Sequence, residues 1–298
     1  MAKERSAFRN RVEASAFRLA VWLFSRLSLP GAERFGQRLG RLWMRVDAKR
    51  RRLARTNLAR AFPELSEEEV RALSRRVFEH LGGLGAELVW SFHEPLEELV
   101  GRFEVSGAEF ARAAVASGRG VLFLSPHLGN WEAGALAFGA LGLPATIVVR
   151  PLDNPEINRH FAAFRERSGH RLIPKADAAR EVLRTLRKGG SIGILPDQHA
   201  RTPDALVVPF FGRPASTTSA VARFADKTEA LILPTSSFRT GPGGRYRITI
   251  EEPIDVRTLT KEERTPEALT ARVNEVQERQ IRKAPEQWMW VHNRWRLD

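Results

Sequence analysis

The sequence predicts an α/β fold in which a mostly parallel mixed sheet is flanked by helices and preceded by an N-terminal helical layer. Three observations predict it: helical patterns fill the first hundred residues, short β-rich runs then alternate with helical segments, and neither internal repeats nor low-complexity linkers interrupt the chain. Such alternation is typical of a parallel sheet covered by helices. We therefore expect a helical layer over residues 1–100 and an α/β core over residues 101–298, joined in one domain.

The composition limits the classes of function. With 298 residues and 43% hydrophobic residues, the chain can bury a sizeable core, so a wholly disordered or fibrous chain is excluded. The chain has no cysteine, which excludes disulfides, thiolate metal sites and a cysteine nucleophile. A formal charge of +13 is carried mainly by arginine, which suits bidentate contacts to phosphate or carboxylate. The partners to consider are nucleic acid, anionic lipid and a phosphorylated substrate.

The first predicted helix is basic and amphipathic. Phe8, Val12, Leu19, Leu23 and Leu27 recur at helical spacing, and arginines lie among them. Its apolar run is far shorter than the roughly 20 residues that a membrane-spanning helix needs, and no signal-peptide cleavage site follows it. Two interpretations stay open: an anchor that lies in the interface of an anionic leaflet, or a helix packed on its own domain.

Further helices of the layer are expected over residues 32–46 and 49–62. The next helix begins with a capping box formed by Ser66 and Glu69 and runs towards Trp90. The uncharged stretch 133–149 is broken by glycines and a proline, so it predicts a core helix followed by a buried strand and not a membrane span.

The core is expected to contain short strands rich in Val, Ile and Leu. These runs lie at residues 121–124, 145–149, 171–173, 191–195, 231–233 and 246–250. The helical segments lie near residues 130–141, 155–168, 176–188, 216–226 and 266–283. The sequence Gly-Pro-Gly-Gly at 241–244 predicts an antiparallel hairpin late in the chain.

One segment, SPHLGNWEAG at 125–134, combines groups that can do chemistry directly after a buried strand. Active sites are built at the carboxyl ends of parallel strands, and Pro126 delays helix entry until after His127. Glu132 then lies in the first turn of the helix, where its carboxylate can orient the imidazole so that the ring takes a proton from a hydroxyl. The helix start at Gly129 and Asn130 is expected to offer free backbone N–H groups to an anion. Spacing alone slightly favours the alternative of a turn-capping histidine and a glutamate that suits a helix start.

Other signals are absent or ambiguous. The sequence has no G-x-S-x-G elbow, Walker loop, dinucleotide-binding glycine motif or H-E-x-x-H motif. His199 lies close to Asp197, but no third ligand stands at a suitable spacing, so we assign no metal and no cofactor. Trp288, Trp290 and Trp295 either line an acyl groove or belong to the core.

The segment His127–Glu132 matches H-x-x-x-x-[DE], the HX4E motif of the glycerolipid acyltransferase superfamily. Five further blocks are similar, in order and over nearly the whole chain, to those of the lipid A late acyltransferases, the lauroyl and myristoyl transferases. These blocks are NLARAFP at 57–63, VRP and NP within 149–155, PDQ at 196–198, VPFFGRPASTT at 208–218 and APEQWMW at 284–290. The chain therefore resembles this family.

The resemblance implies transfer of a fatty acyl chain from a thioester, on acyl carrier protein or coenzyme A, to a hydroxyl of a lipid A precursor-type glycolipid. It implies that His127 is the general base, that Glu132 orients it, and that Arg150 binds the acceptor. It also implies that Asp197 either binds the acceptor or orders the site. It also implies a peripheral or monotopic protein on the cytoplasmic face of the inner membrane. Many family members carry an N-terminal membrane span where this chain has the amphipathic helix.

Alternatives follow from the same residues. Arg150 could pair with Asp153 or Glu156, and Asp197 could cap a turn. The acceptor could be another membrane glycolipid, such as a phosphatidylinositol mannoside. A nucleic-acid-binding protein would suit the charge, but no basic–aromatic module or helix-turn-helix pattern occurs. A non-catalytic, basic, membrane-associated scaffold is the third alternative, and the intact HX4E motif argues against it.

Overall fold

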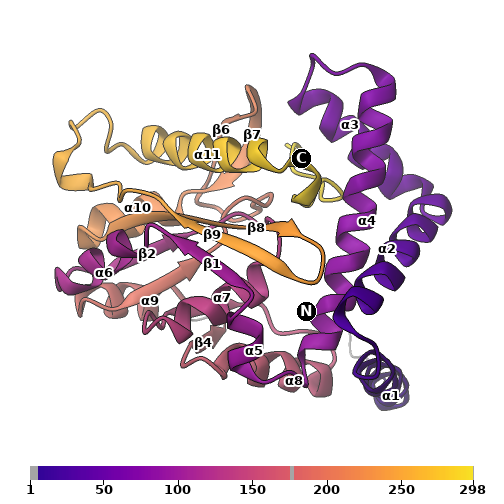
Figure 1. Cartoon of the computed structure of the whole chain (residues 1–298). Coiled ribbons are helices and arrows are strands. Elements are labelled where there is room, and N and C mark those ends of the chain that lie inside the picture. The colour runs from indigo at the N-terminus through magenta and orange to yellow at the C-terminus, as the bar shows by residue number, and fades with distance from the viewer. Residues whose placement is uncertain (1–5, 175–177, 298) are drawn as a thin grey trace.

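The computed structural model describes residues 6–174 and 178–297. Its main sheet lies at the centre of the molecule (Figure 1). The strands of this sheet are β1 (Phe103–Ser106), β2 (Val121–Leu124), β3 (Thr146–Val149), β4 (Arg171–Pro174), β5 (Ser191–Ile194), β8 (Leu231–Gly241) and β9 (Arg245–Ile250). A separate antiparallel hairpin consists of β6 (Ala205–Phe210) and β7 (Arg213–Thr218).

The seven-stranded sheet has the order β1-β9-β8-β2-β5-β3-β4. β8 and β9 pair antiparallel across the predicted hairpin, and the other neighbours pair in parallel. Helices cover both faces of this mixed sheet, so the predicted fold class is confirmed. These helices are α6 (Ala108–Ala116), α7 (Trp131–Ala140), α8 (Pro155–Glu166), α9 (Ala178–Arg187), α10 (Ala220–Thr228) and α11 (Pro266–Lys283).

The N-terminal helices are α1 (Ala7–Phe24), α2 (Leu29–Val46), α3 (Ala48–Ala61), α4 (Glu67–Ser91) and α5 (Leu96–Val100). Of these helices, α2, α3 and α4 stand at one end of the sheet, whereas α5 lies beside α7 (Figure 1). The capping box at the start of α4 is confirmed, because the Ser66 hydroxyl accepts from the Glu69 backbone and the Glu69 carboxylate accepts from the Ser66 backbone. Within residues 6–174 and 178–297 no helix is long and apolar enough to cross a membrane.

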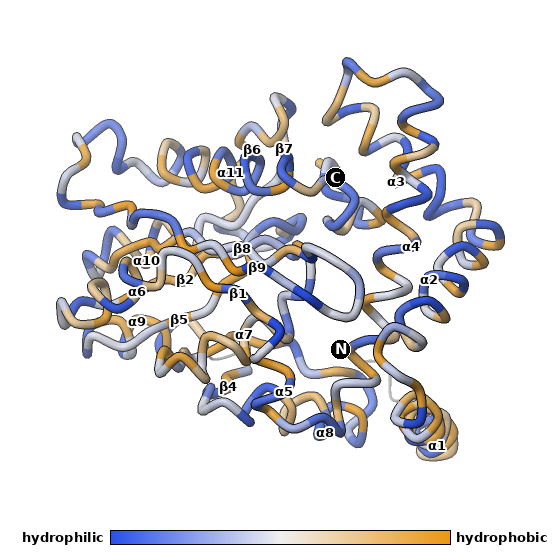
Figure 2. Tube along the Cα trace, in the orientation of Figure 1, coloured by the Kyte–Doolittle hydropathy of each residue, from blue (hydrophilic) through white to orange (hydrophobic). Residues whose placement is uncertain are grey.

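The central strand β2 is buried on both faces. Val121 and Phe123 belong to the core beneath α6 and α7, whereas Leu122 and Leu124 belong to the core beneath α9, α10 and α11. An unbroken apolar run is therefore required, because both faces of a helix-covered parallel strand are removed from water. Figure 2 shows that hydrophobic residues also follow α1 at the edge of the molecule.

Two β elements were not predicted from the sequence. β1 was not predicted, although its residues alternate between half-buried and exposed as in an edge strand, because four residues give too short a pattern. The β6–β7 hairpin was not predicted either: it carries Pro209 and Pro214, which are unusual within strands, and turns through Phe211 in a left-handed conformation. Residues 216–218 of the predicted helix consequently belong to β7, and α10 starts at Ala220. Residues 176 and 177 of another predicted helix lie outside the described residues.

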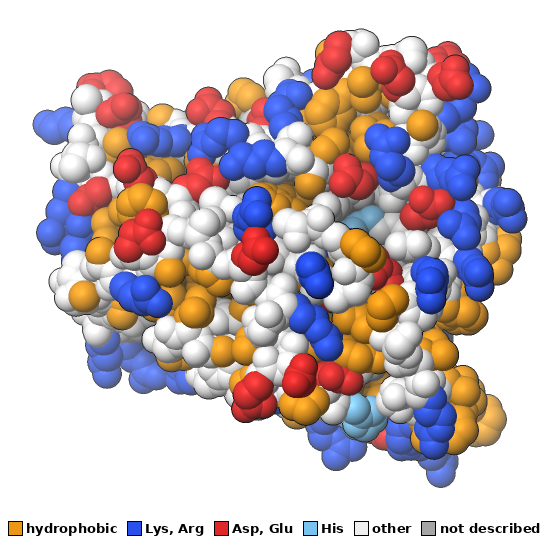
Figure 3. All heavy atoms as spheres, in the orientation of Figure 1, with side chains coloured by type: hydrophobic (Ala, Val, Ile, Leu, Met, Phe, Trp, Pro, Cys, Tyr) orange, Lys and Arg blue, Asp and Glu red, His pale blue; other side chains and the backbone are white. Residues whose placement is uncertain are grey.

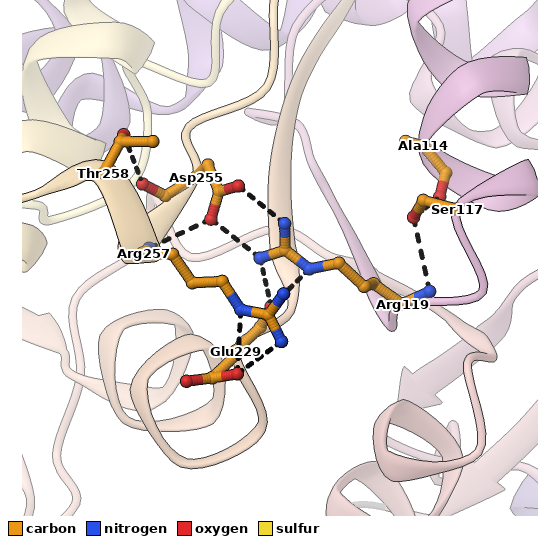
Figure 4. Close-up of polar contacts among 7 residues, drawn as sticks. All are labelled: Ala114, Ser117, Arg119, Glu229, Asp255, Arg257 and Thr258. Carbon is orange, nitrogen blue, oxygen red and sulfur yellow. Dashed lines mark hydrogen bonds and ion pairs between the residues drawn. The ribbon is translucent and has the colours of Figure 1, made fainter.

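Two ion-pair clusters fasten the elements. At the end of the sheet where β2 begins, both terminal nitrogens of Arg119 donate to the Asp255 carboxylate at 2.6 and 2.7 Å (Figure 4). The Arg119 guanidinium also donates to the backbone carbonyl of Glu229. The hydrogen bonds from Arg119 lower the pKa of Asp255 to about 2. The loop before β2 is thereby joined to the end of α10 and to the short helix η2 (Val256–Thr258).

The second cluster is buried between the helical layer and the sheet. Arg239 of β8 lies between two carboxylates, Glu33 of α2 at 3.0 Å and Glu87 of α4. The Tyr246 hydroxyl of β9 donates to the Glu87 carboxylate at 2.6 Å, and burial together with that carboxylate raises the tyrosine pKa well above 10. Because two buried carboxylates share one guanidinium, the packing of the layer depends on Arg239.

We predict that Arg239→Met destabilises the protein by about 3–5 kcal/mol, since it leaves buried carboxylates without a counter-charge. Arg247→Met is the matched control, because Arg247 is half exposed and pairs with the exposed Glu104 at 2.9 Å. Arg247→Met should lower the free energy of unfolding by less than about 1 kcal/mol. Urea unfolding measured by circular dichroism compares them, and equal losses of unfolding free energy would contradict the role of Arg239.

Candidate active site

The register of two neighbouring strands brings His127 and Asp197 together. β2 and β5 pair in parallel with Leu124 opposite Ile194, and each strand is followed two residues later by a proline. His127 and Asp197 each lie three residues beyond this pair. Both side chains therefore leave the same edge of the sheet at the same level, across one inter-strand spacing of about 4.8 Å.

The Asp197 carboxylate is 1% exposed and accepts three hydrogen bonds. The His127 backbone N–H donates to Oδ2 at 2.8 Å, the Trp288 indole Nε1 donates to Oδ2 at 2.7 Å, and the His127 ring Nδ1 lies 2.6 Å from Oδ1. An ionised carboxylate only accepts, so Nδ1 carries the proton in this contact. The other ring nitrogen, Nε2, is then unprotonated in the neutral ring, and its neighbour is the Gln198 amide at 3.5 Å.

The electrostatics of the pair favour a charged carboxylate and a basic ring. Burial by itself would raise the pKa of Asp197, but the charge of His127 and the three hydrogen bonds hold that pKa below its usual value. Burial by itself would lower the pKa of His127, but the charge and hydrogen bond of Asp197, with a smaller contribution from Glu132, raise it above 6.5.

These shifts define the pH range in which the ion pair stabilises the fold. The raised His127 pKa contributes stability that is fully present below 6.5 and is lost as pH rises through the folded-state pKa. The lowered Asp197 pKa contributes stability that is present above 3.8 and is lost as pH falls through the folded-state value. The pair is therefore most stabilising in the weakly acidic range between these limits.

The predicted contact between Glu132 and the His127 ring is not made. Glu132 lies in the first turn of α7, as predicted, but its two carboxylate oxygens accept from Arg165 of α8 at 2.6 and 2.8 Å. Asp197, which follows the adjacent strand β5, contacts Nδ1 of the ring instead. The hydrogen bonds from Arg165 to Glu132 raise the pKa of the Arg165 guanidinium.

The loop after His127 is held from beneath. The Asn130 side chain caps α7 by accepting from the Ala133 N–H at 3.0 Å and donates to Glu87 at 3.1 Å. The Gly129 N–H donates to the Gln287 carbonyl at 3.2 Å, so this backbone group is not free for an anion, contrary to the expectation for Gly129. Through Glu87, the loop is therefore joined to the Arg239 cluster, the buried group formed by Arg239, Glu33, Glu87 and Tyr246.

Arg150, the other predicted acceptor ligand, lies exposed directly after β3. Since β5 separates β3 from β2, Arg150 leaves the same edge of the sheet about two strand spacings, roughly 10 Å, from the His127 strand. One alternative partner, Glu156, pairs with Arg18 of α1. Among the described residues no group of three or more His, Asp or Glu side chains is arranged to hold a metal ion.

Two contributors to the site were not found from sequence. Trp288, Trp290 and Trp295 are buried, which confirms the core interpretation, but the Trp288 indole also holds Asp197. Its only sequence signal was the APEQWMW block. Arg165 gave no signal, because its contact with Glu132 depends on how α8 packs beside α7.

Comparison with known proteins shows that the chain is an acyltransferase. Residues 2–297 match the family model of the bacterial lipid A biosynthesis acyltransferases, and the chain belongs to that family. It is 31% identical over 277 residues to the lipid A biosynthesis lauroyltransferase of Escherichia coli, which covers 93% of this chain and 89% of that one.

Another lipid A acyltransferase and one solved structure are less similar in sequence. The lipid A biosynthesis palmitoleoyltransferase of Escherichia coli is 26% identical, with 93% of this chain and 88% of that one covered. A solved structure, the 1-acyl-sn-glycerophosphate acyltransferase of Thermotoga maritima, shares 20% identity and a TM-score of 0.40, with 84% of this chain and 98% of that one covered.

We predict that Trp288→Phe lowers both stability and turnover, because it removes a donor from the buried Asp197 carboxylate. Trp295→Phe is the matched control: its indole donates to the Phe210 carbonyl at 3.0 Å, away from the carboxylate. Each variant should lose about 1–3 kcal/mol of unfolding free energy, but turnover should fall about tenfold in Trp288→Phe alone. Equal turnover in the two variants, measured well below their melting temperatures, would remove Trp288 from the site.

Proposed function

We propose that the protein transfers a fatty acyl chain from a thioester of acyl carrier protein to a hydroxyl of a lipid A precursor-type glycolipid. The observation that carries this proposal is the buried Asp197 carboxylate, which fixes the His127 ring with Nε2 available as a base. Membership of the lipid A family and the named activities of its relatives support the substrate class.

In the proposed reaction, His127 Nε2 takes the proton of the acceptor hydroxyl while the hydroxyl oxygen attacks the thioester carbonyl carbon. The tetrahedral intermediate collapses, the carbon–sulfur bond breaks, and the departing sulfur takes the proton from the imidazolium. An ester and a free thiol result, and the ring returns to its neutral form. Asp197 stabilises the imidazolium that exists between the two proton transfers.

Glu132 and Arg150 receive distinct proposed roles. Glu132 acts on His127 through its charge, which contributes to the raised histidine pKa, and its pair with Arg165 fixes α8 beside the site. Arg150 extends from the same edge of the sheet, where its fork suits a phosphate or sugar oxygen of the acceptor. The exposed apolar residues of α1 support our proposal that the enzyme lies peripherally on the cytoplasmic face of the inner membrane.

The direct test is acyl transfer by the purified full chain in detergent micelles, with acyl carrier protein and coenzyme A thioesters as alternative donors. Mass spectrometry detects one added acyl chain on a lipid A precursor. His127→Ala should lose about a hundred- to ten-thousand-fold in turnover, the range of positioned general-base catalysis. Asp197→Asn should lose at least about a hundredfold, and Glu132→Gln less, because it does not contact the ring.

His160→Ala is the matched control, since this exposed histidine lies on α8 against Phe17 and should leave turnover unchanged. If His127→Ala retained near-parental turnover while remaining folded, the general-base assignment would be wrong. If the parent acylated no glycolipid with either donor, the proposed activity itself would be wrong.

A further inference from the structure

Helix α2 is held rigidly against α4 by one face. Gly36 and Gly40 lie at this contact, where a methyl group on either residue would collide with the α4 carbonyl oxygens of Gly82 or Phe78. Such close approach of two helix backbones requires glycine. Glu33, on the same helix, is tied to the buried Arg239 at 3.0 Å. The orientation of α2 on the body of the enzyme is therefore fixed.

A lateral face of α2, one residue and therefore about 100° round the helix from Gly36 and Gly40, carries a row of exposed apolar side chains. Phe35, Leu39, Leu42 and Val46 are 45%, 46%, 52% and 71% exposed. Their spacing of four, three and four residues places them on one side of a helix. Large apolar side chains scattered singly on a surface need no explanation, but a continuous row marks an interaction site.

A second row, of arginines, runs beside the apolar row. Arg34, Arg38, Arg41 and Arg45 each precede one of its members by one residue. Three of them are exposed, and Arg41 pairs with Glu79 at 3.1 Å. α2 thus presents an apolar row and a positive row from residue 34 to its C-terminal end.

The apolar row continues onto α1. Phe24 at the end of α1 meets Phe35 edge to face, with ring centroids 5.7 Å apart. Beyond that junction the exposed apolar residues of α1 are Phe8, Val12, Leu19, Trp22 and Leu23. Arg26 stacks over the Trp22 ring at 3.6 Å. Figure 3 shows hydrophobic and basic side chains side by side along the edge of the molecule that these helices form.

We propose that this surface, formed by the exposed rows of α2 together with those of α1, docks the enzyme on an anionic lipid bilayer. The apolar row would lie at the boundary between headgroups and acyl chains, and the arginines would contact phosphate groups. Charge complementarity decides between occupants: a second copy of this chain brings the same positive charge, whereas anionic lipid supplies the opposite one. The proposal rests on the proposed function, because a bilayer is where a lipid acceptor resides.

The proposal assigns membrane docking to α2 as well as to α1, and it fixes the orientation of the enzyme relative to the bilayer. α1 contributes to docking, but it also packs inward on the enzyme. The Phe17 ring centroid lies 5.5 Å from that of Phe92 and 6.2 Å from that of Phe161. Because α2 is joined to the Arg239 cluster that supports the His127 loop, the enzyme would meet the bilayer in one orientation and not as a tethered, rotating body.

The experiment is flotation of the full chain on vesicles of phosphatidylcholine alone or of phosphatidylcholine with phosphatidylglycerol. Leu39→Gln/Leu42→Gln should reduce binding to the anionic vesicles at least tenfold. Arg34→Gln/Arg38→Gln/Arg45→Gln should weaken it by about fivefold per arginine and abolish the preference for phosphatidylglycerol. Glutamine is a good helix former, so α2 should remain folded by circular dichroism.

Matched controls lie elsewhere on the surface. Val207→Gln removes an exposed apolar residue of β6, and Arg180→Gln/Arg187→Gln/Lys188→Gln removes three exposed charges at α9. Both controls should float like the parent. Parental flotation of the α2 variants, or a parental dimer that these variants convert to monomers in light scattering, would overturn the proposal. Acyl transfer in detergent micelles is measured in parallel: if the parent fails there, the proposed function fails irrespective of flotation.

Discussion

The Asp197 carboxylate is buried almost completely and is satisfied by donors from two distant parts of the chain. His127 lies 70 residues before it and Trp288 lies 91 residues after it. An ionised carboxylate without such partners would cost several kcal/mol in this environment. The Asp197 carboxylate therefore requires that β2, β5 and the C-terminal segment pack together. This packing fixes the position of the His127 ring.

The rest of the architecture supports this point from two sides. The C-terminal segment that carries Trp288 is anchored by Asn57 of α3, whose side-chain amide donates to the Trp290 and His292 carbonyls at 2.8 Å. The loop that carries His127 rests on Glu87 and, through it, on Arg239. The helical layer is thus a structural support for the active site on its inner side and, in our proposal, a lipid-facing surface on its outer side.

Local patterns in the sequence predicted local structure well. The run VLFL became a strand buried on both faces, and the Ser66–Glu69 capping box began a helix as expected, because both depend on neighbouring residues alone. The partner of His127 could not be predicted in this way. Spacing favoured Glu132, five residues away, whereas Asp197 reaches the ring through the register of two strands, and Arg165 reaches Glu132 through the packing of two helices. Contacts of this kind depend on tertiary structure and leave no periodic signal.

The central claim is that Asp197, and not Glu132, holds the His127 ring and makes the larger contribution to its raised pKa. Nitrogen-15 NMR of histidine-labelled protein, with His127 assigned by its loss in His127→Ala, reports the tautomer and the pKa directly. The parent should show a proton on Nδ1 and a pKa above 6.5. In Asp197→Asn the pKa should fall below 6.5, because burial then dominates, whereas Glu132→Gln should keep the tautomer and lower the pKa less. A larger fall in Glu132→Gln than in Asp197→Asn would contradict the account.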